Sequence, residues 1–159
     1  LWYNHKHIQK VSDRTLLNLL VGLSSSASKV DEKDLEKAIG LVKQRANTVK
    51  ELWMLSEYFF IGPSNYESKS VKKINNPGLS RVLSKIVDLA VSETTSKESF
   101  VLEMKKWAEK NGFSSGQIMM TIRVVLVGSL SGVDLQEIIN FLDLETVRKR
   151  AENAIQKIL

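Results

Sequence analysis

IRVVLVGSLSGVDLQEIINFL, residues 122–142, decides the fold class of this chain of 159 residues. Its Val-Val-Leu-Val run, 124–127, favours a β-strand by residue propensity. Apolar residues of the same region also recur at helical spacing, namely Ile118, Ile122, Val125 and Leu126. No second strong strand lies nearby in the sequence to pair with the run. We therefore predict a helix over 116–128.

The rest of the chain carries the same helical signal. Apolar residues recur at steps of three and four almost throughout, whereas strict alternation is nearly absent, so we expect an all-α fold. The apolar ladder from Asp31 to Phe60 is long for one helix. We expect it to break at Gly40 or within Arg45-Ala-Asn-Thr48, where Asn47 or Thr48 could cap a second helix.

The composition excludes several kinds of protein and site. With 43% apolar and 26% charged residues, the chain has the composition of a soluble globular protein. It contains no cysteine, which excludes disulfides and zinc fingers and fits a cytoplasmic location. No apolar run approaches the roughly 20 residues that span a bilayer, so we expect no membrane segment. Because the chain starts at Leu1-Trp-Tyr rather than at methionine, we expect a fragment of a longer protein.

The charge of the chain suits a partner that carries phosphates. The formal net charge is +5, and residues 66–85 hold five cations against one acid, Glu67. The cations of this basic segment are Lys69, Lys72, Lys73, Arg81 and Lys85. The segment could be the footprint of a general nucleic-acid-binding module.

No catalytic motif occurs in the sequence. The loop from Gly128 to Gly132 is followed by Val-Asp and lacks the lysine that a phosphate-binding P-loop requires. His5 and His7 are the only histidines, and two imidazoles make a poor metal site. No nucleophile-elbow pattern surrounds any serine. We therefore expect neither catalytic residues nor a metal site in this chain.

Two stretches of the sequence carry a family resemblance. The first is LVKQRANTVKEL, 41–52, followed by SEYFF, 56–60, and the second is IRVVLVGS, 122–129, followed by LQEI, 135–138. Together they resemble the C-terminal half of bacterial glutamyl-tRNA synthetase. The start, Trp2-Tyr-Asn4, is similar to the Trp-x-Asn signal with which the family's anticodon-binding part begins. The order and spacing of these motifs carry the resemblance, which covers essentially the whole chain. The family's ATP-handling motifs lie upstream of such a segment and do not occur here.

This resemblance implies an all-helical anticodon-binding region in two subdomains, 1–61 and 62–159, the second a helical cage. It also implies that Arg45 recognises the third anticodon base, a cytosine in tRNA for glutamate. The chemistry suits this role, because RNA loops are recognised by engaging unstacked bases, and a guanidinium offers a planar fork of donors.

Further positions of the resemblance fall in the loop that follows the helix predicted over 116–128. Gly128 would stop the helix, and Gly132, Val133 and Leu135 would lie beside the first two anticodon bases. Family members commonly have an aromatic residue where this chain has Gln136, and some have a glutamine at Met120. Arg123 is the cation that the family retains here, with a structural alternative in which it pairs with Asp134 or Glu137. Contacts to the RNA backbone are expected, more weakly, from three lysines: Lys69, Lys72 and Lys73.

The resemblance therefore implies tRNA anticodon recognition by a part of a glutamate–tRNA ligase. The parent enzyme would use ATP and Mg²⁺ to attach glutamate to tRNA, while this part would bind no cofactor, catalyse nothing and act as a monomer. The sequence leaves open whether tRNA for glutamine is also a partner. Two alternatives remain at this stage: a general helical RNA- or DNA-binding module, and a helical protein-interaction module.

Overall fold

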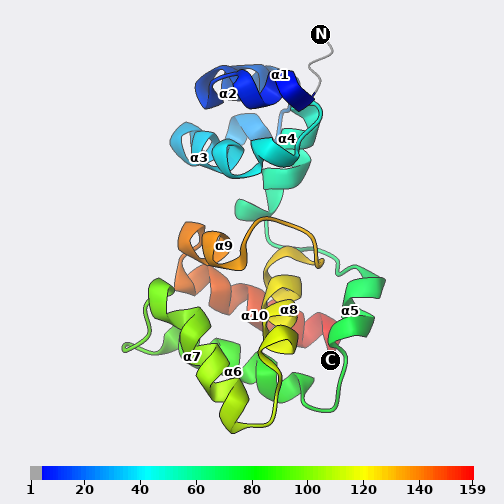
Figure 1. Ribbon diagram of the computed structural model, residues 1–159, viewed down its shortest axis with the longest axis vertical. Coiled ribbons are helices and arrows are strands. Elements are labelled where there is room, and N and C mark those ends of the chain that lie inside the picture. The colour runs from blue at the N-terminus through cyan, green and yellow to red at the C-terminus, as the bar shows by residue number, and fades with distance from the viewer. Residues whose placement is uncertain (1–4) are drawn as a thin grey trace. The chain divides into compact units, whose positions relative to one another are not determined.

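The computed structural model describes residues 5–159, so the Trp2-Tyr-Asn4 motif lies outside the described residues. The chain divides into two compact units, Leu1–Ile61 and Gly62–Leu159. Between residues 5 and 159 the regular structure consists of helices only (Figure 1). The stretch with strand propensity forms helix α8, Ser115–Val127, which confirms the prediction of a helix there and of an all-α fold.

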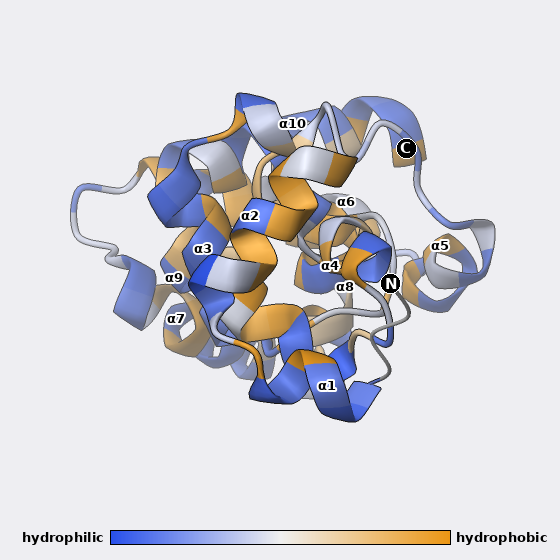
Figure 2. Cartoon of the chain, turned by 90° about the horizontal axis from the view of Figure 1, so that it is seen from above, coloured by the Kyte–Doolittle hydropathy of each residue, from blue (hydrophilic) through white to orange (hydrophobic). Residues whose placement is uncertain are grey.

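In the described part of unit 1, residues 5–61, the regular structure consists of four α-helices and three short 3-10 turns. The helices are α1 (His5–Lys10), α2 (Asp13–Leu23), α3 (Glu32–Val42) and α4 (Val49–Ser56). Single 3-10 turns follow α2, α3 and α4 at Ala27–Lys29, Lys43–Arg45 and Glu57–Phe59. Apolar stripes on α2, α3 and α4 pack together, with Leu16, Leu35 and Leu52 fully buried among them. Figure 2 shows the apolar and polar residues alternating around α2 and α3.

The long apolar ladder of unit 1 is broken where the sequence offers a cap. Helix α3 ends at Val42, and the hydroxyl of Thr48 accepts a bond of 3.2 Å from the backbone N–H of Glu51 at the start of α4. The prediction of a break before Thr48 is confirmed, whereas Gly40 lies inside α3. A Cβ at Gly40 would lie 2.9 Å from Oδ2 of Asp13, so this glycine allows α3 to approach the start of α2 closely.

Unit 2 contains six helices around one core. They are α5 (Ser68–Ile74), α6 (Leu79–Val91), α7 (Lys97–Lys110), α8, α9 (Leu135–Phe141) and α10 (Leu144–Ile158). Helix α10 packs along α6 and against α8, while α5 packs on α8 and α9 packs on α7 (Figure 1). Phe100, Met104 and Ile122 are fully buried between these helices. None of the helices within 5–159 has the length and apolar content required to cross a bilayer.

Candidate nucleic-acid interface

Helix α8 ends at Val127, and the residue that caps it, Gly128, occupies a position that only a glycine fits. Gly128 has φ of +86°, and its N–H donates to the carbonyl of Val124 over 2.7 Å, which closes the last turn. A Cβ at this position would lie 2.9 Å from the carbonyl oxygen of Asn65 and 2.9 Å from Cβ of Pro63. The prediction that Gly128 stops the helix is confirmed, and the close approach adds a reason that the sequence did not reveal.

The loop between α8 and α9, residues 128–134, is attached to helix α5. The backbone N–H of Glu67, just before α5, donates to the carbonyl of Gly128 over 2.8 Å. The N–H of Leu130 donates to Oγ of Ser70 over 3.1 Å, and the same hydroxyl donates to the carboxylate of Glu67. Ser70 is only 2% exposed, so the hydroxyl that joins Leu130 to Glu67 is largely shielded from water. The α8–α9 loop is therefore fixed to the basic segment at two points.

Arg123 supports the other end of the same loop. Its Nη1 donates to the backbone carbonyl of Val133 over 2.6 Å, and its side chain is half-buried. The expected carboxylate partners have other positions: Asp134 caps α9 by accepting from the N–H of Gln136 over 2.8 Å, and Glu137 is exposed. Arg123 therefore has a structural partner, but this partner is the backbone carbonyl of Val133 rather than a carboxylate.

The side chains of the predicted base-contacting residues are largely occupied within the protein. Val133 and Leu135 are 3% and 6% exposed, so their side chains belong to the core of unit 2. Nε2 of Gln136 donates to the carbonyl of Lys97 over 3.1 Å and to Oδ1 of Asn140 over 2.9 Å. Gly132 is half-buried with φ of +133°, beside the exposed Ser131. The residues that this loop presents at the surface are therefore mainly small ones.

The three lysines that are predicted to bind the RNA backbone lie on helix α5. Lys69, Lys72 and Lys73 are exposed on α5, the helix that also carries Ser70. None of the ion pairs within the described part of the chain includes these lysines. Helix α5 packs on α8 and is bonded to the α8–α9 loop, so the helix that carries these lysines is the one that holds the loop.

One face of α10 holds the segment that enters unit 2, a feature that the sequence analysis missed. Nδ2 of Asn153 donates to the carbonyl of Pro63 over 3.1 Å, and Nζ of Lys157 donates to that of Ser64 over 2.6 Å. Arg150 donates to the carbonyl of Leu126 over 2.6 Å, and burial lowers its pKa to about 10, so it remains a cation at neutral pH. The only trace of these three side chains in the sequence is their spacing of three and four residues, which places them on one face of a helix.

In unit 1, Arg45 is exposed at the end of the 3-10 turn Lys43–Arg45. Bonds on both sides fix this turn. Nζ of Lys43 pairs with Oδ1 of Asp13 over 2.7 Å, and the carbonyl of the fully buried Ala46 accepts from Nδ1 of His5 over 3.0 Å. The backbone around Arg45 is thus held in place, and the residue is exposed to solvent. Within 5–159 no group of three or more His, Asp or Glu side chains could hold a metal ion.

Comparison with known proteins identifies the class. The sequence matches, over residues 7–155, the family described as anticodon binding domain, and the chain belongs to this family. Membership implies a tRNA partner, because the anticodon is part of a tRNA.

The chain is similar to one part of several glutamate–tRNA ligases. The chain is 36% identical over 97% of its length to the glutamate–tRNA ligase of Flavobacterium psychrophilum, of which it covers 31%. It is 32% identical over 98% of its length to that of Porphyromonas gingivalis W83, again covering 31%. A crystal structure of a glutamate tRNA ligase from Elizabethkingia meningosepticum superposes with a TM-score of 0.83 at 25% identity, covering 99% of this chain and 32% of that one. The chain therefore spans about a third of the length of the proteins it resembles.

Proposed function

We propose that this chain recognises the anticodon of tRNA for glutamate as part of a glutamate–tRNA ligase. In this proposal the two units, 1–61 and 62–159, are two anticodon-binding subdomains. The parent enzyme uses ATP and Mg²⁺ to join glutamate to tRNA, and this part contributes RNA binding without catalysis. We expect a monomer that works in the cytoplasm, where proteins are synthesised.

The observation that carries the proposal is the attachment of the α8–α9 loop to the lysine-bearing helix α5. Leu130 and Gly128 bond to Ser70 and Glu67, so the loop is already ordered beside three exposed cations. Single-stranded RNA binds to such surfaces through phosphate contacts with lysines and close approach of bases to backbone groups. An ordered loop also loses little conformational entropy when RNA binds.

Arg45 supports the proposal from unit 1. Its side chain is exposed on a turn that Lys43 and Ala46 hold in place, as a reader of base edges requires. A well-made bidentate contact to a base contributes about 1 to 3 kcal/mol in duplex DNA, and we transfer that magnitude to an RNA loop. We therefore expect about a tenfold to hundredfold preference for the matching third base.

The test is binding of the chain to transcripts of tRNA for glutamate with the natural third anticodon base or an altered one. The affinity should fall about tenfold to hundredfold with the altered base, and the affinity for both should decrease with salt. Equal affinities would favour a general nucleic-acid-binding module. No binding even at low salt, where phosphate contacts are strongest, would favour a protein-interaction module.

A further inference from the structure

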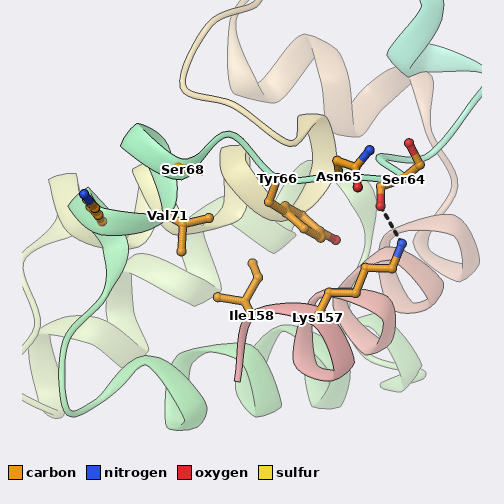
Figure 3. Close-up of a pocket in the computed structure, with 8 residues that line it drawn as sticks. Ser64, Asn65, Tyr66, Ser68, Val71, Lys157 and Ile158 are labelled. Carbon is orange, nitrogen blue, oxygen red and sulfur yellow. Dashed lines mark hydrogen bonds between the residues drawn. The ribbon is translucent and has the colours of Figure 1, made fainter.

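A hollow of about 580 Å³ lies on the surface of unit 2. Three segments line it: residues 64–66, helix α5 and the end of α10 (Figure 3). The lining residues are Ser64, Asn65, Tyr66, Ser68, Val71, Lys72, Lys157 and Ile158. The lining thus contains two cations and no carboxylate, a combination that favours an anionic ligand.

One part of this hollow is apolar and includes an aromatic ring. Tyr66, Val71 and Ile158 surround it (Figure 3). The hydroxyl of Tyr66 accepts from Nδ2 of Asn153 over 3.2 Å, which orients the ring. A nucleobase is flat and can stack on an aromatic ring or pack against aliphatic side chains regardless of its sequence.

The other part of the hollow is polar and positive. Nζ of Lys157 uses one donor for the carbonyl of Ser64, and an ammonium group has three. Lys72 and the hydroxyl of Ser68 add further donors at the same hollow. Phosphate oxygens accept such bonds, and the charge of the donor strengthens them. An apolar wall beside cationic donors matches the two parts of a nucleotide.

The hollow adjoins the α8–α9 loop. The carbonyl oxygen of Asn65, a lining residue, lies 2.9 Å from the position of a Cβ on Gly128. The neighbouring residue Glu67 donates its N–H to the carbonyl of Gly128. We propose that this hollow binds one nucleotide of the same RNA strand that the α8–α9 loop contacts. This inference rests on the proposed RNA-binding function and adds to it a second binding site, the hollow.

The test places a negative charge in the hollow without disturbing the fold. Ser68 is exposed at the first position of α5, where an aspartate is favourable to the helix, so Ser68→Asp should fold normally. Its carboxylate would repel a phosphate, and we expect the affinity for the natural transcript to fall about fivefold to tenfold. The slope of log affinity against log salt should become shallower by about 0.7 if one phosphate contact is lost.

The matched control is Ser80→Asp, which adds the same charge in the first turn of α6 at an exposed residue outside the hollow. It should leave affinity and slope unchanged. No loss with Ser68→Asp, or the same loss with both variants, would overturn the nucleotide site. A further outcome would also overturn it: free 5′-UMP binds to the wild-type chain, Ser68→Asp abolishes this binding, and the affinity for tRNA stays unchanged. The hollow would then be a site for a free nucleotide.

A separate readout distinguishes this inference from the proposed function. Ser68→Asp should lower the affinities for the natural and third-base-altered transcripts by the same factor, because the hollow is expected to bind without base preference. If the wild-type chain discriminates the third base and Ser68→Asp has no effect, the nucleotide site fails while the proposed function stands. If the wild-type chain binds no transcript, the proposed function itself fails.

Discussion

The turn that carries Arg45 and the α8–α9 loop are two candidate RNA-contacting regions with opposite construction. At the turn, the backbone is fixed by Lys43 and Ala46, and the candidate group is one exposed side chain. In the loop, the side chains of Val133 and Leu135 are buried, and the small residues Ser131 and Gly132 lie at the surface. RNA binding by the turn should therefore depend on the identity of one residue, Arg45. RNA binding by the α8–α9 loop should depend on the bonds that hold the loop in place.

This difference predicts different responses to mutation. Replacing Arg45 should change base preference with only a small effect on stability, because the interactions of an exposed charged side chain contribute little to folding. Replacing a residue that holds the α8–α9 loop should change stability first and RNA binding as a consequence. Three variants test this contrast in order of expected effect on the free energy of unfolding.

The largest effect is expected for Gly128→Ala. The variant forces a φ of +86° on a residue with a Cβ and places that Cβ 2.9 Å from a backbone oxygen of Asn65. We expect the free energy of unfolding to fall by about 2 to 3 kcal/mol, measured by urea denaturation. Gly116→Ala in the same helix is the control, because a Cβ there meets no atom within 4 Å. A comparable loss in both variants would contradict the role of Gly128.

The next effect is expected for Ser70→Ala. The variant removes the hydroxyl that joins Leu130 to Glu67 and leaves the partly buried N–H of Leu130 without its partner, which should cost about 1 to 2 kcal/mol. Affinity for the transcript should fall as well, because the loop loses an attachment. Ser56→Ala is the control: Ser56 is fully buried too, but its hydroxyl bonds only to carbonyls of its own helix. The control should cost less and leave RNA binding unchanged.

A smaller effect is expected in unit 1 for Lys43→Gln. Its ion pair with Asp13 is partly buried, with side-chain exposures of 19% and 33%, so we expect a loss of about 1 kcal/mol. Arg14→Gln is the control, since Arg14 and Glu32 are 55% and 61% exposed and such pairs contribute little. Equal losses in thermal or urea unfolding would mean that burial of the pair does not matter.

The sequence was sufficient where the signal is local. The helical spacing of Ile118, Ile122 and Val125 outweighed the strand propensity of 124–127, and α8 is a helix. Thr48 was one of two candidate caps, beside Asn47, because a cap depends on residue type and on the neighbouring residues. The stop at Gly128 was expected from the family resemblance, and the structure confirms it.

The sequence was insufficient where partners are distant. Leu130 bonds to a serine 60 residues away, and Asn153 bonds to Pro63 across 90 residues. Neither Ser70 nor the polar face of α10 carries a motif, so only the folded chain reveals what they hold. Arg123 illustrates the same limit: its charge suggested a carboxylate partner, but the fold presents the carbonyl of Val133.

The most direct test of the central claim combines Arg45→Gln with the change of the third anticodon base. Four affinities are measured: wild-type and variant chain, each with the natural and the altered transcript. If Arg45 recognises this base, each change alone should weaken binding about tenfold to hundredfold, and the second change should then cost little. Losses that simply add in free energy would contradict direct recognition of the third base by Arg45.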